Sequence, residues 1–396
     1  MILNIKRYYF LAFSFLTVLS NMFSGCKKAN LTSTDETFIK YYDIGVTSFY
    51  ENESGNMIMY GEGTFNNQNS NLFLSTMDQY GNLLNVSGFG ANYGTVASLY
   101  RFDGYYFIYG NTYETPRVRH LDKNLNLLSD HEVKVFENFG TDSEFIVPQK
   151  LISASDGGIV ILYTLYNGYN FTSGECGLLE VDDSFKNIKW NVSLGSPLST
   201  NDVINTSDGY ISCYTNNSNV GEPNNVFLAK TDLNGNILWK NISLDPSNYD
   251  LPMNLILMNN DSFIVFYESL AHHNSNFGTL LASTFDQNGT LLSSYDLQTK
   301  VSGIGSAVLT ADKGFMVTGA HNGVVTIGML LAKFDAGLHK QWEHDFYSES
   351  GGTAGGSLYP LRNGGYVVLA STKAFGKGKT GTGGVIYKTD ANGEIH

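Results

Sequence analysis

The stretch "AKTDLNGNILWKNISL", residues 229–244, decides the fold of this chain. It consists of an apolar strand, an aspartate, a turn centred on Gly235, and a second apolar strand that carries Trp239. Asp-x-x-Gly suits a tight hairpin, because glycine accepts a positive φ and the aspartate side chain bonds the local backbone. The stretch therefore predicts two antiparallel strands joined by a short turn.

The same phrase recurs along the whole chain. The aspartates that open its seven copies are Asp78, Asp122, Asp183, Asp232, Asp286, Asp335 and Asp390. The three tryptophans of the protein, Trp190, Trp239 and Trp342, each lie seven residues after such an aspartate. A shared register of this kind indicates a structural repeat rather than scattered hairpins.

A second phrase, a turn followed by an aromatic or apolar run, precedes each copy of the first. The residues just before these runs are Gly55, Gly104, Gly158, Gly209, Ser262, Gly314 and Gly365, at spacings of 49 to 54 residues. Each repeat thus supplies four short strands, which in the fourth repeat are expected at 200–206, 209–215, 226–232 and 236–243. Seven such repeats predict an all-β fold, a seven-bladed β-propeller of four-stranded antiparallel blades.

The last repeat is incomplete. The chain stops at "YKTDANGEIH" (387–396), where a fourth strand is expected, while "TFIKYYDIG" (37–45) precedes the first repeat without a partner. We expect 37–45 to pair beside 383–390 as the outermost strand of the seventh blade. Such pairing would close the propeller and remove its open sheet edges.

The N-terminal segment has the layout of a secretory signal. Lys6 and Arg7 precede an apolar run at 8–20 that is too short to span a membrane, and "FSGC" follows, ending at Cys26. This ending resembles the bacterial lipoprotein box, which implies a lipid on Cys26. The expected organisation is a signal peptide at 1–25, the lipidated cysteine and a tether at 26–36, and the propeller at 37–396.

The net charge of the chain limits the classes of partner that it can bind. Without residues 1–25 the chain has 22 Lys and Arg against 37 Asp and Glu, a net charge of −15. This balance disfavours nucleic acid and anionic lipid surfaces as partners. Cys176 and Cys213 could form a disulfide in an oxidising envelope or remain buried thiols, and the sequence leaves both open.

The repeats resemble known propeller families. Asp-x-x-Gly-x-x-x-Trp, as at 232–239, is similar to the tryptophan-docking repeats of quinoprotein-type propellers, and the blade length is similar to that of kelch-like propellers. The DGGY-like and KTDxxGNxxW phrases together resemble lipoproteins of Bacteroidota-like bacteria over residues 36–396. The resemblance implies the fold and indoles that pack on the next blade, and it implies no activity.

No catalytic or metal motif stands out. The seven aspartates suit the first position of a turn. The stretch "DLNGN" (232–236) does not continue as a calcium loop, because Ile237 stands in place of the glycine at position six and Ser243 in place of the glutamate at position twelve. HExxH, GxSxG and sialidase boxes are absent from the sequence. The sequence therefore predicts no metal, no cofactor and no enzyme, although carboxylates gathered in a central channel would escape this search.

The loops between strands two and three, and between successive blades, vary in length and composition, which is typical of recognition loops. Several display aromatics beside polar residues, and histidines are expected in the second-to-third-strand loops of the fifth and sixth repeats. The predicted ligand-binding residues are Tyr113, Glu114, Phe139, Tyr166, Tyr169, Tyr249, His272, His273, His321 and Phe375. We expect a lipid-anchored module of the cell envelope, at the outer membrane, that binds a protein partner. The alternatives are a glycan-binding propeller, or a hydrolase or lyase that acts on a polysaccharide.

Overall fold

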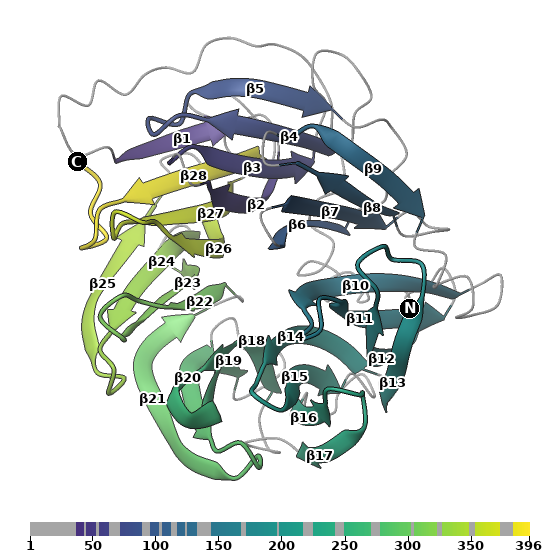
Figure 1. Ribbon diagram of the computed structural model, residues 1–396. Coiled ribbons are helices and arrows are strands. Elements are labelled where there is room, and N and C mark those ends of the chain that lie inside the picture. The colour runs from purple at the N-terminus through teal and green to yellow at the C-terminus, as the bar shows by residue number, and fades with distance from the viewer. Residues whose placement is uncertain are drawn as a thin grey trace, which may run out of the picture. The chain divides into compact units, whose positions relative to one another are not determined.

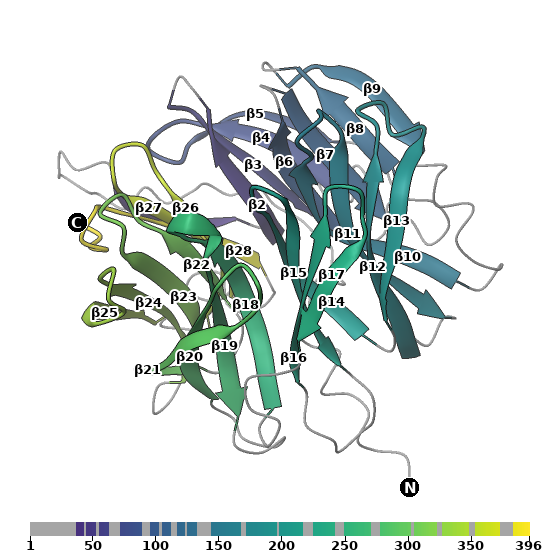
Figure 2. The ribbon, with the colours of Figure 1, turned by 60° about the horizontal axis from the view of Figure 1, so that its bottom comes forward.

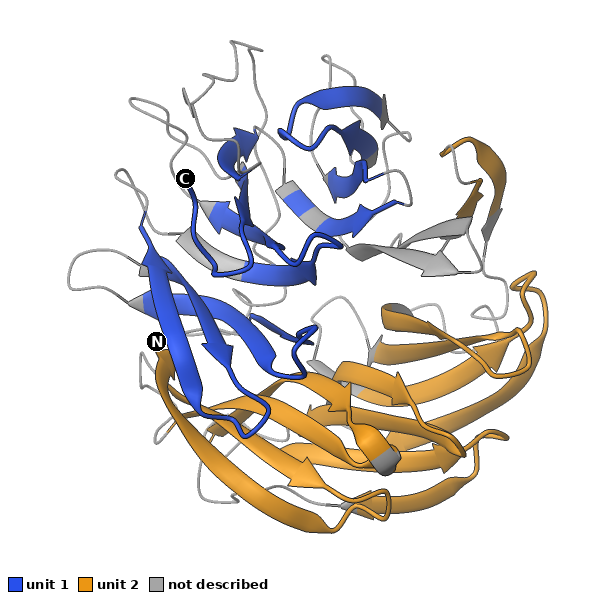
Figure 3. Cartoon of the chain, turned by 60° about the vertical axis from the view of Figure 1, so that its left-hand side comes forward, with its two compact units in different colours: residues 1–95, 301–396 blue, residues 96–300 orange. Residues whose placement is uncertain are grey.

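The structure is a computed structural model of the chain. It describes residues 37–42, 45–52, 55–62, 72–88, 96–102, 105–111, 117–122, 125–132, 144–167, 172–195, 198–216, 225–241, 249–270, 278–301, 305–322, 327–347, 353–372 and 383–396. Two compact units divide the chain, residues 1–95 with 301–396 and residues 96–300 (Figure 3). The predicted signal peptide, Cys26 and tether lie outside the described residues.

The first unit holds blades 1, 6 and 7 of the predicted propeller (Figure 1). Blade 1 is β2 (Gly45–Glu51), β3 (Met57–Glu62), β4 (Leu72–Met77) and β5 (Leu83–Gly88). Blade 6 is β22 (Ser306–Leu309), β23 (Phe315–Asn322), β24 (Ile327–Phe334) and β25 (Lys340–Phe346). Blade 7 is β26 (Thr353–Pro360), β27 (Tyr366–Thr372), β28 (Gly383–Thr389) and β1 (Phe38–Tyr42).

The second unit holds blades 2 to 5. Blade 2 is β6 (Val96–Phe102), β7 (Tyr105–Asn111), β8 (Arg117–Leu121) and β9 (Leu127–Glu132). Blade 3 is β10 (Glu144–Ser153), β11 (Ile159–Asn167), β12 (Thr172–Val181) and β13 (Ile188–Gly195). Blade 4 is β14 (Leu198–Asn205), β15 (Gly209–Asn216), β16 (Val226–Asp232) and β17 (Ile237–Asn241). Blade 5 is β18 (Tyr249–Leu257), β19 (Phe263–Leu270), β20 (Gly278–Phe285) and β21 (Leu291–Val301), with the short 3-10 turn η3 (Asn259–Asp261) between its first two strands.

Seven four-stranded sheets thus confirm the predicted repeat, and the strands of blade 4 begin and end within two residues of the expected positions. The pairing is antiparallel from each strand to the next, as the short hairpin turns require. Within the described ranges no helix has the length and apolar character needed to cross a membrane.

The aspartate turns form as predicted at six of the seven positions. In blade 4 the Asp232 side chain accepts the backbone N–H groups of Asn234 and Asn236 at 2.9 and 2.8 Å, and Gly235 has φ +79°. Asp183 was the wrong choice for blade 3. The neighbouring Asp182 opens that turn, accepting the N–H of Lys186 at 2.9 Å, because this turn contains one extra residue.

The blade tryptophans dock on the following blade, as the resemblance to tryptophan-docking propellers implies. Trp190 of blade 3 donates its indole N–H to the carbonyl of Leu233 in the turn of blade 4 at 3.0 Å. Its ring lies on Gly235, where an added Cβ would come 2.5 Å from Trp190 Cε3. Trp239 of blade 4 donates in the same way to Gln287 O of blade 5, at 3.1 Å. Glycine in the turn therefore serves both the positive φ and the docking of the neighbouring indole.

The N-terminal strand completes blade 7, as expected. β1 pairs antiparallel with β28, placing Phe38 opposite Lys388 and Tyr42 opposite Gly384 (Figure 1). We call this β1–β28 pairing the clasp. Trp239 and Trp342 pair with Lys230 and Lys333 in the same way, so Phe38 occupies the tryptophan register of its blade.

Phe38 also docks as the tryptophans do. Its ring lies against Gly81 in the turn of blade 1, where an added Cβ would come 2.7 Å from Phe38 Cζ. Two hydrogen bonds join the same blades: Lys388 Nζ donates to Gln79 O at 2.9 Å, and Tyr42 Oη to Gly81 O at 3.0 Å. The clasp therefore links blade 7 to blade 1 through the same kind of ring-on-glycine and hydrogen-bond contacts that join other neighbouring blades.

The two cysteines outside the N-terminal segment are free and fully buried thiols. Cys176 packs in the apolar cluster between blades 3 and 4, and Cys213 in the cluster between blades 4 and 5. Burial raises the pKa of both thiols, so neither is a reactive thiolate at neutral pH.

Candidate functional site

Each blade has two ends. We call the end with the first-to-second and third-to-fourth strand turns the turn end, and the opposite end the loop end. At the loop end of blade 6, β23 finishes at Asn322 and β25 at Phe346 (Figure 2). The candidate site described next lies there, within one compact unit.

Strand register brings His321 and Asp345 to one face of blade 6. His321 pairs with Gly328 on β24, and Leu330, two residues along the same strand, pairs with Asp345. Residues directly opposite, or two apart on one strand, share a face of the sheet. The other face carries Met329, Leu331 and Trp342 into the apolar cluster shared with blade 7.

The two side chains form a close pair. His321 Nδ1 lies 2.7 Å from Asp345 Oδ1, and the side chains are 24% and 28% exposed. A carboxylate only accepts hydrogen bonds, so Nδ1–H is the donor, and whenever the ring is neutral its lone pair lies at Nε2. Among the residues that the structure describes, none hydrogen-bonds Nε2 of His321.

Tyr347 follows β25 directly and completes the group. Its ring covers Gly328, the strand neighbour of His321, where a Cβ would lie 2.5 Å from Tyr347 Cε1. Burial, the charge of Asp345 and a hydrogen bond to that carboxylate raise the pKa of Tyr347, which keeps the phenol protonated at neutral pH. Tyr347 as a whole residue is 47% exposed. We call His321, Asp345 and Tyr347 the loop-end triad.

The triad is suited to proton transfer. A histidine whose Nδ1–H is held by a carboxylate has a fixed tautomer and a basic Nε2, the arrangement of a general base. Among the described residues, no serine hydroxyl or cysteine thiol is hydrogen-bonded to the His321 ring. The exposed Tyr347 ring adds an apolar surface of the kind that stacks on sugars.

The predicted binding residues are only partly placed. His321 lies at the loop end of blade 6, but inside β23 rather than in the following loop, because its ladder to Gly328 continues the strand. Tyr249 is the half-buried first residue of β18, in the other compact unit. The backbone of Tyr166 belongs to β11. The remaining predicted residues, Tyr113, Glu114, Phe139, Tyr169, His272, His273 and Phe375, lie outside the described residues.

The sequence-based search missed Asp345 and Tyr347. Both belong to "WEHDFY" (342–347), Asp345 near the end of the fourth strand and Tyr347 just after it, where no motif marks them. The available signal was positional: an aspartate and a histidine that finish the fourth and second strands of one blade lie at the same end of the sheet.

The loop end of blade 5 buries carboxyl groups. Glu268 on β19 is 2% exposed and Asp250 on β18 is fully buried. Burial raises the pKa of Glu268 to about 7, partly offset by the N–H of Gly278, which donates to Oε1 at 3.1 Å. A glutamate that holds its proton near neutral pH is a potential general acid. Motif searches miss Glu268 because it lies in the apolar strand "FIVFYESL".

Comparisons with known proteins bear on the fold. The chain matches no protein-family model, and the search of curated proteins found no match either. It is similar to a solved ulvan lyase, described as a new family of polysaccharide lyase, bound to -[GlcA(1-4)Rha3S]-. The TM-score is 0.61 at 10% identity, covering 88% of this chain and 94% of that one. A puromycin hydrolase gives a TM-score of 0.56 at 10% identity, covering 90% of this chain and 53% of the hydrolase.

These comparisons correct one prediction. The sequence analysis expected a protein that is not an enzyme, yet both of these similar structures are enzymes that superpose on most of this chain. At 10% identity the likeness establishes the fold and leaves the activity to the residues of the site. The chain is a seven-bladed β-propeller, closed in its last blade by its own N-terminal strand.

Proposed function

We propose that this protein cleaves a polysaccharide by proton transfer at the loop end of blade 6. The observation that carries the proposal is the 2.7 Å pair between His321 Nδ1 and Asp345 Oδ1, which leaves Nε2 as a base. This activity was an alternative in the sequence analysis, behind a protein-binding role. The fold likeness to a polysaccharide lyase supports it without assigning the reaction.

Each member of the triad has a role in the proposal. His321 Nε2 removes a proton, either from the sugar carbon next to a uronate carboxylate or from a water molecule. In the first case the neighbouring C–O bond breaks, a C=C bond forms and the leaving oxygen takes up a proton. In the second the water oxygen attacks the anomeric carbon, the glycosidic C–O bond breaks and the leaving oxygen takes up a proton. Asp345 orients the imidazole and stabilises its charged form, and the Tyr347 ring stacks on the sugar.

The setting of the reaction is also proposed. A lipid on Cys26 would hold the propeller at the cell envelope, outside the cytoplasm, with the tether at 26–36 between membrane and fold. Metabolic labelling with a radioactive fatty acid tests this, because Cys26→Ser should remove the label. Labelling that persists in this variant would refute the anchor.

The activity is tested on the secreted chain with a panel of neutral and uronate-containing polysaccharides. New reducing ends report any cleavage, and ultraviolet absorbance of an unsaturated sugar distinguishes elimination from hydrolysis. We expect His321→Asn to lower the rate by roughly 10²- to 10⁴-fold, the usual contribution of a general base. Asp345→Asn should also lower it, because an amide can present a donor to Nδ1 and favour the wrong tautomer.

Blade 6 offers a matched control. His339 also pairs with an aspartate, its Nδ1 lying 3.2 Å from Asp335 Oδ2, but at the turn end of the blade. His339→Asn should keep the full rate. Full activity of His321→Asn, or no product from any polysaccharide, would refute the proposal. Retention on glycans without product would instead favour the glycan-binding alternative.

A further inference from the structure

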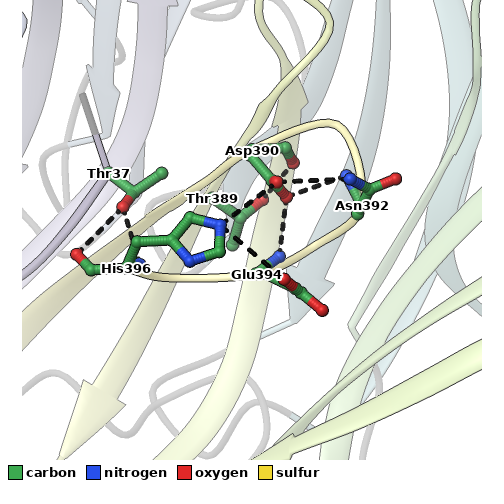
Figure 4. Close-up of polar contacts among 6 residues, drawn as sticks. All are labelled: Thr37, Thr389, Asp390, Asn392, Glu394 and His396. Atoms are coloured by element: carbon green, nitrogen blue, oxygen red, sulfur yellow. Dashed lines mark hydrogen bonds and ion pairs between the residues drawn. The ribbon is translucent and has the colours of Figure 1, made fainter. Parts of the chain in front are cut away.

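We propose that Asp390, Glu394 and His396, at the turn end of blade 7, form a binding site for a divalent transition metal ion. The sequence analysis predicted no metal site, and the proposed cleavage reaction does not use these residues. Figure 4 shows the three side chains converging beside the clasp. Their ligand atoms all lie within 4.8 Å of one another.

The repeats of the chain show what is unusual here. In blades 1 to 4 an asparagine near the end of the turn donates its side-chain amide to the second carboxylate oxygen of the turn aspartate. These bonds are Asn82 to Asp78 at 2.8 Å, Asn126 to Asp122 at 2.9 Å, Asn187 to Asp182 at 2.6 Å and Asn236 to Asp232 at 2.8 Å. Blade 7 has Glu394 in this place, four residues after Asp390. A carboxylate thus replaces the amide donor and places a second potential metal ligand beside Asp390.

The distances match the separation of ligands around a metal ion. His396 Nε2 lies 3.5 Å from Asp390 Oδ2 and 3.6 Å from Glu394 Oε2, longer than typical hydrogen bonds. Ligands at about 2.0–2.2 Å from a tetrahedral ion are about 3.3–3.6 Å from each other. Asn392 Nδ2 also approaches Asp390 Oδ2, at 3.3 Å. A modest inward rotation of Glu394 would complete three protein ligands.

The backbone fixes two of the three ligands. Asp390 Oδ1 accepts the N–H groups of Asn392 and Glu394, both at 2.8 Å, which leaves Oδ2 directed at the histidine. His396 N donates to Thr37 Oγ1 at 2.9 Å, so the histidine is anchored to the residue that leads into β1 (Figure 4). Ile395, between the acid and the histidine, packs on the core of blade 7.

The ligand set selects the class of ion. One imidazole nitrogen and two carboxylate oxygens suit Zn²⁺, and also Mn²⁺ or Co²⁺, whereas Ca²⁺ needs six to eight oxygen ligands. Glu394 is 54% exposed, so water can complete the coordination. A bound ion would tie the last turn of blade 7 to Thr37, and through it to the clasp.

The test is calorimetric titration of the mature chain with ZnCl₂, and in parallel with MnCl₂. We expect one equivalent of metal to bind, and a rise in Tm of a few degrees at saturating metal. Glu394→Asn should abolish binding while restoring the side-chain bond seen in blades 1 to 4, so that this variant stays folded. His396→Gln should weaken binding at least tenfold.

Two controls make the test specific. Asn236→Glu places a carboxylate beside Asp232 in blade 4, where no histidine follows, and should add no second site. His339→Asn removes the other exposed histidine–aspartate pair and should leave binding unchanged. The proposal is overturned if neither metal binds at millimolar concentration, or if Glu394→Asn binds with the affinity of the unmodified chain.

Discussion

The clasp gives the sharpest stability prediction, for Phe38→Ala. Phe38 is 4% exposed and its ring lies on Gly81. The ammonium groups of Lys40 and Lys388 lie 5.6 and 5.9 Å from the ring centre. Truncating a buried phenylalanine to alanine costs about 3–5 kcal/mol, because apolar contacts are lost and a cavity remains. The loss of the two cation–π contacts is small enough to be included in this cost.

The expected shift in Tm follows from the size of the fold. Residues 37–396 number 360. An unfolding entropy of about 2.1 cal/mol/K per residue gives about 0.76 kcal/mol/K for the whole chain. If the chain unfolds in one transition, Phe38→Ala should therefore lower Tm by about 4–7 °C. Differential scanning calorimetry measures this shift and also shows whether a single transition occurs.

Two variants of the same strand make the experiment decisive. Tyr41 is 39% exposed, so Tyr41→Ala should cost about 1 kcal/mol or less and lower Tm by about 1 °C. Phe38→Trp should keep most of the stability, since tryptophan occupies this register in blades 3, 4 and 6. If Phe38→Ala lowers Tm by no more than Tyr41→Ala does, the claim that the clasp stabilises blade 7 is refuted.

Three further predictions rest on buried groups. Gly235→Ala should cost about 2 kcal/mol or more in urea unfolding, because φ is +79° and the new Cβ meets the Trp190 ring; an unchanged midpoint would contradict the docking. The folded-state pKa of Glu268 is raised from 4.5 to about 7, so its proton stabilises the fold at low pH and this contribution is lost as pH rises from 4.5 to 7. Glu268→Gln should therefore match the unmodified chain at pH 4 and exceed its stability at pH 8 by at most about 3 kcal/mol, whereas equal stability at pH 8 would argue against the raised pKa. Cys176 and Cys213 should resist a thiol reagent in the native protein and both react in urea; a disulfide detected by mass would contradict the free thiols.

Much of this fold could be predicted because its information is local and repeated. Each Asp-x-x-Gly turn forms its own hairpin, and the register of Trp239 repeats from blade to blade. The one misassigned turn has a local cause too: two adjacent aspartates, Asp182 and Asp183, compete for its first position, and the extra residue shifts the count to Trp190.

The candidate site was far less visible. His321 and Asp345 are 24 residues apart and meet only because β24 sets the register between their strands. A sequence pattern shows the spacing of residues along a strand, but not how far each strand slides against the next. Glu268 was hidden for another reason: an isolated acid in an apolar strand has no partner pattern, and only burial reveals its chemistry.

The β1–β28 pairing also determines when folding can finish. Phe38 pairs with Lys388, so nearly the whole chain must be synthesised before blade 7 can gain its fourth strand. Contacts of such long sequence separation form slowly, because the chain loses the entropy of a long loop before the strand pairing can stabilise it. Until then the edge of β1 that pairs with β28 stays bare, which favours pairing with other chains. We therefore expect blade 7 to mature last, and stalled or truncated chains to aggregate or be degraded through this edge.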